Sequence, residues 1–148
     1  MSLDKYDKSF YTMGDDISYN SFMGLYLTAL FHHRHIRFPV SDVDHFEADG
    51  YLTNAVMKNK RTVFSLDSSI NAVALLLPGN HCDRCHKSSI ANLHRIDALI
   101  PGITPYYCTS SNEIMKVSKH EMAHLKDIMF CYHPFEGVRR RKGWTYED

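Results

Sequence analysis

The sequence lacks any excess of charge, because 17 Lys and Arg residues balance 17 Asp and Glu residues over its 148 positions. Proteins that bind nucleic acids through charge alone carry a surplus of Lys and Arg, which attracts phosphates. The net charge therefore gives no indication of a nucleic-acid partner and favours a small molecule. The densest positive run, residues 139–142, predicts a basic tail over residues 137–148.

Long apolar segments are also missing. The longest run, residues 22–31, contains Gly24 and Thr28 and is too short to cross a bilayer. The N-terminus shows no basic region followed by an apolar stretch, as a secretory signal would. We therefore expect a cytoplasmic protein without a membrane partner, in which the four cysteines are thiols or metal ligands.

Repeats, low-complexity segments and flexible linkers are absent as well, which predicts one domain over residues 1–148. Hydrophobic residues make up 44% of the chain, which is enough to bury a sizeable core. The sequence contains no glycine-rich phosphate loop and no serine nucleophile elbow. Two common kinds of active site are thereby excluded.

Residue patterns predict a mixed α/β chain. Strands are predicted within residues 17–38 and at residues 63–66, 72–77, 103–109 and 130–135. Helices are predicted at residues 4–13, 41–57, 82–96 and 110–128. The later half thus alternates between strands and helices, as in domains whose helices pack on a sheet.

Histidine and cysteine, the residues that bind zinc, stand out: the chain has ten His and four Cys. Two residues separate Cys82 from Cys85, so both sulfurs can reach one zinc ion from a single helical turn. Upstream, His45 and Glu47 lie near the predicted start of another helix. One His and two Cys leave a zinc position open for water, and a nearby Glu can move protons to and from that water.

On His45, Glu47, Cys82 and Cys85 the chain resembles the zinc-dependent cytidine and deoxycytidylate deaminase superfamily, whose pattern is His-x-Glu followed by Pro-Cys-x-x-Cys. The resemblance implies a single three-layer α/β/α domain with a mixed central sheet of about five strands. It implies a zinc cofactor on His45, Cys82 and Cys85, with Glu47 as the catalytic proton shuttle. The implied activity is hydrolytic deamination of a cytosine-type or related nucleobase, nucleoside or nucleotide. The partner would be that small molecule, and we expect a homo-oligomer.

A second zinc motif gives an alternative enzyme. His120, Glu121 and His124 form a His-Glu-x-x-His pattern, which resembles the zincin metallopeptidases. A spacing of four places both imidazoles on one helical face, where they could share zinc while Glu121 acts as general base. No third ligand occurs at a spacing typical of those peptidases.

A non-catalytic interaction protein is the alternative of another class. In that interpretation Cys82 and Cys85 hold a structural zinc ion that only stabilises the fold. The other two ligands would come from this set: Cys108, Cys131, His81 and His86.

Overall fold

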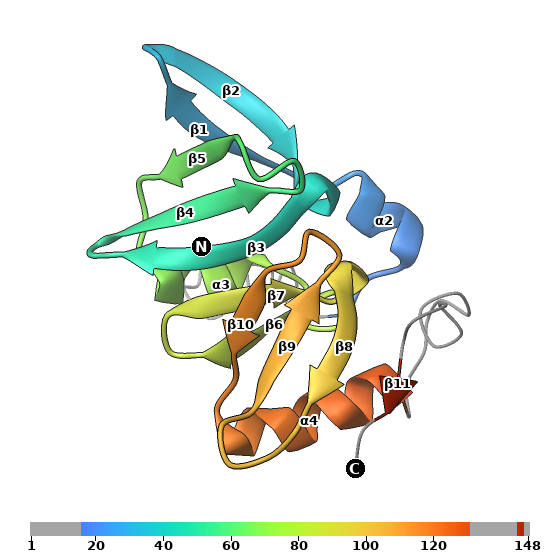
Figure 1. Cartoon of the computed structure of the whole chain (residues 1–148). Helices are drawn as coiled ribbons and strands as arrows, with labels where there is room; N and C mark the ends of the chain where they lie inside the picture. Colours follow the sequence, from blue (N-terminus) through green and yellow to red (C-terminus); the bar gives the residue numbers. More distant parts are fainter. Residues whose placement is uncertain (1–15, 131–144, 147–148) are drawn as a thin grey trace, which may run out of the picture.

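The computed structural model describes residues 16–130 and residues 145–146, whose regular structure is mainly β-sheet (Figure 1). A two-stranded antiparallel sheet consists of β1 (Tyr26–Phe31) and β2 (Arg34–Pro39). A five-stranded sheet has the order β5 (Val63–Leu66), β4 (Leu52–Met57), β3 (Val43–Asp49), β7 (Ser89–Asn92), β6 (Cys82–His86). A four-stranded sheet has the order β10 (Ile114–Lys116), β9 (Tyr106–Thr109), β8 (Ile96–Ile100), β11 (Thr145–Tyr146).

Helices are short in this part of the chain. They are α2 (Tyr19–Met23), α3 (Ile70–Leu76), α4 (Lys119–Phe130) and the 3-10 turns η1 (Val40–Asp42) and η2 (Leu93–Arg95). No helix among the described residues is long and apolar enough to span a membrane. The sheets are packed mainly against each other, so the expected three-layer α/β/α domain with a mixed central sheet is wrong.

The segment predicted as a helix at residues 41–57 is instead the hairpin of β3 and β4. Gly50 adopts φ +63°, a left-handed conformation that glycine enters without steric cost, and so allows the tight turn between the strands. Along β3 the side chains alternate between the faces of the sheet, so Phe46 faces one core while His45 and Glu47 face the other side. His45 and Glu47 therefore lie on a strand and not at a helix start.

Two further local predictions are wrong, the first because strand pairing decides the conformation and the second because a helix cap does. The predicted helix from residue 82 is β6, which pairs with β7 around the turn at Lys87 and Ser88. The predicted strand at residues 72–77 lies mostly in α3, where the hydroxyl of Ser69 accepts a hydrogen bond from the backbone N–H of Ala72 at 3.2 Å. The helix turns Ile70 and Val73 into the core.

Other predictions are confirmed in whole or in part. The strand at residues 63–66 is β5, and β9 lies within the strand predicted at residues 103–109. The last predicted helix starts later than expected, after Ser118, because residues 114–116 form β10. The predicted helix at residues 4–13, most of the strand at 130–135 and most of the basic tail at 137–148 lie outside the described residues. The single-domain prediction stays a prediction.

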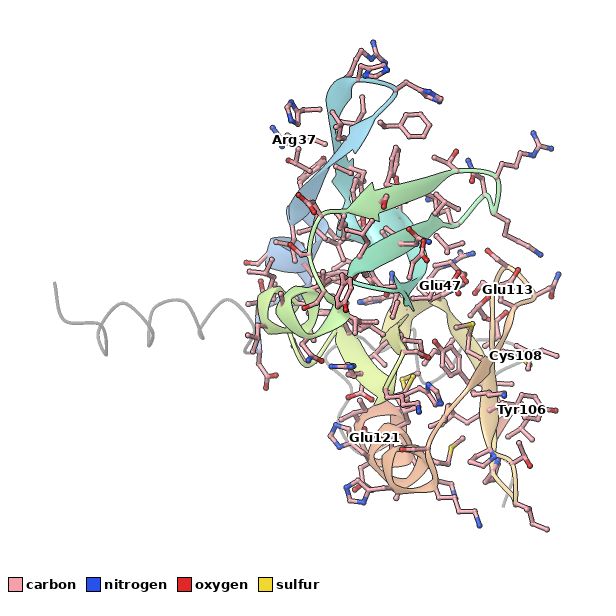
Figure 2. All side chains as sticks on the ribbon, turned by 90° about the vertical axis from the view of Figure 1, so that its left-hand side faces the viewer. Arg37, Glu47, Tyr106, Cys108, Glu113 and Glu121 are labelled. Atoms are coloured by element: carbon pink, nitrogen blue, oxygen red, sulfur yellow. The ribbon has the colours of Figure 1, made fainter. Side chains whose placement is uncertain are left out.

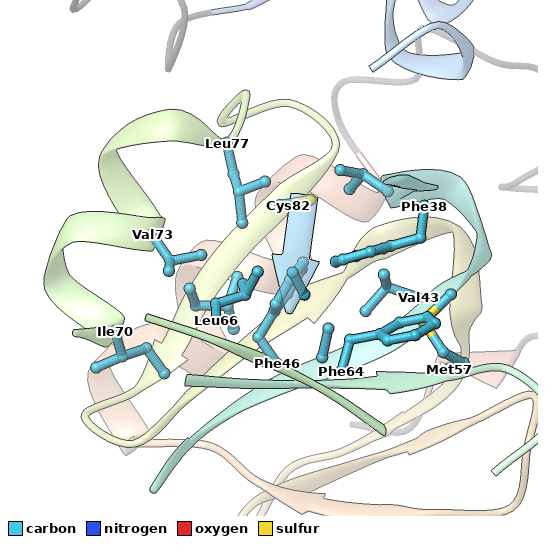
Figure 3. Packing of buried hydrophobic residues seen from close by; sticks show 14 of the residues in the cluster. Phe38, Val43, Phe46, Met57, Phe64, Leu66, Ile70, Val73, Leu77 and Cys82 are labelled. Atoms are coloured by element: carbon cyan, nitrogen blue, oxygen red, sulfur yellow. The ribbon is translucent and has the colours of Figure 1, made fainter. Parts of the chain in front are cut away.

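The five-stranded sheet separates two hydrophobic cores. On one face, Phe46 and Ile90 pack against side chains of α3 and of the β1–β2 hairpin, and we call this the first core (Figure 3). On the other face, Ala91 and Cys85 join Leu99 of β8, Tyr107 of β9 and Leu125 of α4 in the second core. The fold thus places β6 and β7 between the hairpin layer and the layer that contains α4.

Candidate functional site

Three segments meet along one side of the molecule. They are the β3–β4 turn (residues 49–52), the β6–β7 turn (residues 86–89) and the segment that leads into α4 (residues 116–119), and we call them together the contact edge. The backbone N–H of Ala48 donates to the carbonyl of Ser88 at 2.8 Å, and that of Ser118 donates to the carbonyl of Cys85 at 3.0 Å. The segments lie along the left of Figure 1, the side that faces the viewer in Figure 2.

The contact edge presents three lysines, one carboxylate (Asp49) and an aromatic ring to solvent. Lys87, Lys116 and Lys119 are exposed, and none of them forms an ion pair with a described residue. Tyr51, at the tip of the β3–β4 turn, is 90% exposed. The hydroxyl of Ser118 accepts a hydrogen bond from the backbone N–H of Glu121 at 3.2 Å, which fixes the first turn of α4. The edge can therefore attract anionic groups and stack on planar ones.

A cleft of about 490 Å³ lies beside the contact edge, between the β3–β4 strands and β10. Its lining includes His45, Glu47, His86, Lys60 and Glu113. Figure 2 shows Glu47 and Glu113 at similar height on this side of the molecule, while Tyr106 and Glu121 lie lower. The lining carries both signs of charge, and Lys60 pairs with Glu113 at 3.4 Å.

Buried charges fix the position of His45 at the inner end of this cleft. Its Nδ1 donates to Asp44 at 2.9 Å, and Nε of Arg95 donates to the other oxygen of Asp44 at 3.3 Å. Burial alone would raise the pKa of Asp44, but hydrogen bonds from His45 and Thr109 and the charges of His45 and Arg95 outweigh it and lower the pKa. His45 is thus a structural partner of a buried carboxylate.

The predicted deaminase site is not assembled. Nε2 of His45 lies 3.6 Å from Glu47, but Cys82 is packed in the first core, on the opposite face of the sheet. Cys85 is packed in the second core, so Cys82 and Cys85 cannot bind one ion, as catalytic or as structural ligands. Burial and the charge of Asp83 raise the pKa of both thiols, that of Cys85 to about 12, which disfavours the thiolate that zinc needs.

Two of the other residues considered for a structural zinc site have different surroundings. His81 stacks on Phe22 and is hydrogen-bonded through Nδ1 to Nε2 of His94 at 2.9 Å. Nδ1 of His86 lies 2.9 Å from the hydroxyl of Ser88. Cys131 lies outside the described residues.

The His-Glu-x-x-His motif does lie on a helix, α4, but its two histidines do not converge on one point with Glu121. Ligand atoms of Asp83, Glu121 and His124 lie within 4.8 Å of one another, and within the described residues this is the one such group of three. His120 is exposed and is not part of that group. Burial, followed by the negative charge of Glu121, raises the pKa of Asp83 to about 6. Zinc binding stays a prediction.

Sequence motifs did not mark the residues of the contact edge. Tyr51, Lys87 and Lys119 are single residues of common types, and only the folded chain brings their segments together. The one signal in the sequence is Gly50, a turn former directly before an aromatic residue. It predicts a turn and carries no information about the other two segments.

Comparison with known proteins identifies the fold. Residues 33–130, about two thirds of the chain, match the family model described as the LytTr DNA-binding domain. The structure is similar to that of the LytTr DNA-binding domain of a methyl-accepting/DNA response regulator from Bacillus cereus, with a TM-score of 0.62 and 23% sequence identity. That similarity covers 71% of this chain and 96% of the Bacillus cereus chain. No curated protein matches the sequence.

The family match corrects the functional predictions. The zinc-dependent deaminase, with Glu47 as proton shuttle, is wrong, and so is the metallopeptidase based on His120, Glu121 and His124. A small-molecule base or nucleotide as the main partner is also contradicted, because the matched family is defined by DNA binding. Since its model covers well over half of the sequence, the chain belongs to the LytTR family of DNA-binding domains.

Proposed function

We propose that the protein binds double-stranded DNA through the contact edge and regulates the genes that contain the bound sites. The observation that carries the proposal is the match of residues 33–130 to the LytTR family. All three segments of the contact edge lie inside that range. The expected cytoplasmic location belongs to the proposal, because the protein has to work in a compartment that holds DNA.

The contact edge has the features that phosphate binding requires. Lys116 and Lys119 flank the start of α4, a helix of 12 residues whose first N–H groups and dipole favour anions. Lys87 lies on the neighbouring turn, which the Ser118–Cys85 hydrogen bond holds beside α4. Phosphate contacts of this kind fix the orientation of a protein on a duplex.

Tyr51 supplies a different kind of contact. It is the most exposed of the large hydrophobic side chains in the described residues, at 90%, and it projects from a tight turn. An exposed ring on a turn can reach a base edge or a thymine methyl group, contacts that can distinguish sequences. We assign phosphate contacts to the three lysines and a sequence-reading contact to Tyr51.

The small number of unpaired lysines at the contact edge sets the expected salt dependence of DNA binding. Three free lysines at the edge would release about three counterions, so log K should fall with log[salt] with a slope of about −3. A protein with a large positive surplus would show a steeper slope. The neutral composition thus agrees with DNA binding through a few local contacts.

The test starts from a random pool of duplexes, from which sequences are enriched by binding to the full chain. Fluorescence anisotropy then measures the affinity for the enriched duplex at several salt concentrations. Lys87→Ala and Lys119→Ala should each weaken binding and reduce the salt slope by about 0.9. Arg61→Ala is the matched control, since Arg61 is exposed in the β4–β5 turn, at the other end of β4 from the contact edge.

Two results would contradict the proposal. One is the absence of any enriched duplex with folded protein. The other is a loss of affinity in Arg61→Ala equal to that in the two lysine variants, which would indicate general charge attraction and no defined contact edge.

A further inference from the structure

The β1–β2 hairpin carries a separate concentration of positive and titratable side chains. Residues 26–39 contain two arginines and three histidines but no Asp or Glu. Five of these side chains are exposed: His32, His33, Arg34, His35 and Arg37. Four of them are consecutive at the turn. In a chain of zero net charge, two arginines without any acidic neighbour in the hairpin make it a local positive region.

The hairpin is anchored to the five-stranded sheet. Phe31 of β1 and Phe38 of β2 pack against Phe64 of β5, with ring centroids 5.1 Å and 4.9 Å apart. The two strands are in register from the Tyr26–Pro39 pair to the Phe31–Arg34 pair. The guanidinium of Arg37 lies 4.6 Å from the centre of the Tyr26 ring, a cation–π contact that limits its movement. The backbone of the hairpin is therefore held in place, which lowers the entropy cost of binding a ligand.

The turn of the hairpin is not built for stability. His32 and His33, its two central residues, adopt φ +51° and +65°. Asn and Gly are the residues that favour this conformation at both positions of a two-residue turn. Histidine meets a steric cost there that glycine avoids, and strained backbone positions cluster at functional sites. The observed pair places two imidazoles at the tip, next to Arg34.

The hairpin turn lies on the same side of the molecule as the contact edge. In Figure 1 it is at the upper left, above the β3–β4 turn, and in Figure 2 the hairpin forms the top of the molecule, above the strands that carry Glu47. A duplex that runs along the contact edge would thus continue toward the hairpin.

We infer that the β1–β2 hairpin is a second DNA-contacting element, which holds phosphates of the duplex that flanks the site bound by the contact edge. Arg34, beside the turn, supplies the permanent charge, and the tip histidines supply further hydrogen-bond donors. The inference rests on the proposed DNA binding. It goes beyond the family match, which assigns DNA binding to residues 33–130 as a whole and names no contact for the hairpin, whose first strand precedes that range.

The experiment compares two duplexes, one that contains only the enriched site and one that extends the site by ten base pairs on each side. Wild-type protein should bind the extended duplex more tightly. Arg34→Ala should weaken binding to the extended duplex about fivefold near 0.15 M salt and reduce its salt slope by about 0.9. It should leave binding to the short duplex unchanged. Arg34→Lys, which keeps the charge, should retain most of the affinity, and Arg61→Ala should behave as wild type on both duplexes.

A second variant separates binding from folding. His33→Gly relieves the backbone strain at φ +65°, so its Tm should equal or exceed that of the wild type. Its affinity for the extended duplex should nevertheless fall. If the hairpin only supported the fold, His33→Gly would change the Tm and leave the affinity for the extended duplex unchanged.

The outcomes also distinguish the two proposals. If wild-type protein binds neither duplex, the proposed function fails. If it binds both equally and Arg34→Ala changes neither, the proposed function stands and the hairpin inference is wrong. If Arg34→Ala weakens both duplexes equally, the hairpin does not contact flanking DNA, and the inference is again wrong.

Discussion

Replacement of Asp44 by Asn tests whether the buried charge network stabilises the sheet that supports the contact edge. Asp44 is fully buried and accepts hydrogen bonds from His45 and Arg95 at 2.9 Å and 3.3 Å. Asn keeps the shape but removes the negative charge. Because hydrogen bonds to charged groups contribute about 1.5–3 kcal/mol each and an amide retains part of them, we expect a loss of about 2 kcal/mol in the free energy of unfolding at pH 7.

The same variant makes a prediction about pH. The pKa of Asp44 is lowered from its ordinary value of 3.8 in the folded protein, so its stabilisation is complete above that value and is lost as the pH falls through the lowered pKa. The difference in the free energy of unfolding between wild type and Asp44→Asn should therefore become smaller in strong acid. Urea denaturation from pH 7 downward measures it, with Asp67→Asn, an exposed carboxylate, as control. A difference that stays constant over the whole pH range, or none at pH 7, would refute the reasoning.

Three further predictions concern the cores and the thiols. Phe46→Ala should lower the free energy of unfolding by about 3–5 kcal/mol in urea denaturation, because Phe46 is buried. Tyr51→Ala, at an exposed site, should change it by less than about 0.5 kcal/mol. Equal effects of the two variants would contradict the burial of Phe46. Burial lowers the pKa of His81, so as the pH falls the unfolded chain takes up a proton at this residue before the folded protein does. The stability should therefore fall as the pH drops below about 6.5. In thermal melts, His81→Gln should show a weaker dependence of Tm on pH. Cys85 should react with a thiol reagent much more slowly in the folded protein than in urea, and more slowly than the half-buried Cys108; equal rates would show that the second core is open.

Zinc-type motifs predicted the wrong chemistry because their meaning depends on the backbone conformation. A Cys-x-x-Cys pair places both sulfurs on one side of a helical turn, but on β6 Cys82 and Cys85 enter different cores. A His-x-Glu pair keeps His45 and Glu47 on one face of β3, yet the neighbour of His45 is Asp44 and not a metal-binding thiol. The spacing alone does not distinguish these cases.

Strands and helices were predicted best where local signals dominate. The β5 strand follows from its short apolar run, and the helical position of His120 and His124 follows from the spacing of apolar residues along α4. The β3–β4 and β6–β7 hairpins pair neighbouring segments, but the sheet that joins them depends on pairing between residues far apart in the chain, such as His45 with Ala91. The contact edge depends on the same long-range pairing, which explains why its lysines carry no signal in the sequence.

The most direct test of the account is an NMR titration of the full chain with the enriched duplex. Backbone amide signals of residues 49–52, 86–89 and 116–119 should shift or broaden at stoichiometric DNA, while those of residues 59–61, in the β4–β5 turn at the other end of β4, should stay in place. Perturbations confined to the β4–β5 turn, or a spectrum unchanged by the duplex, would contradict DNA binding through the contact edge.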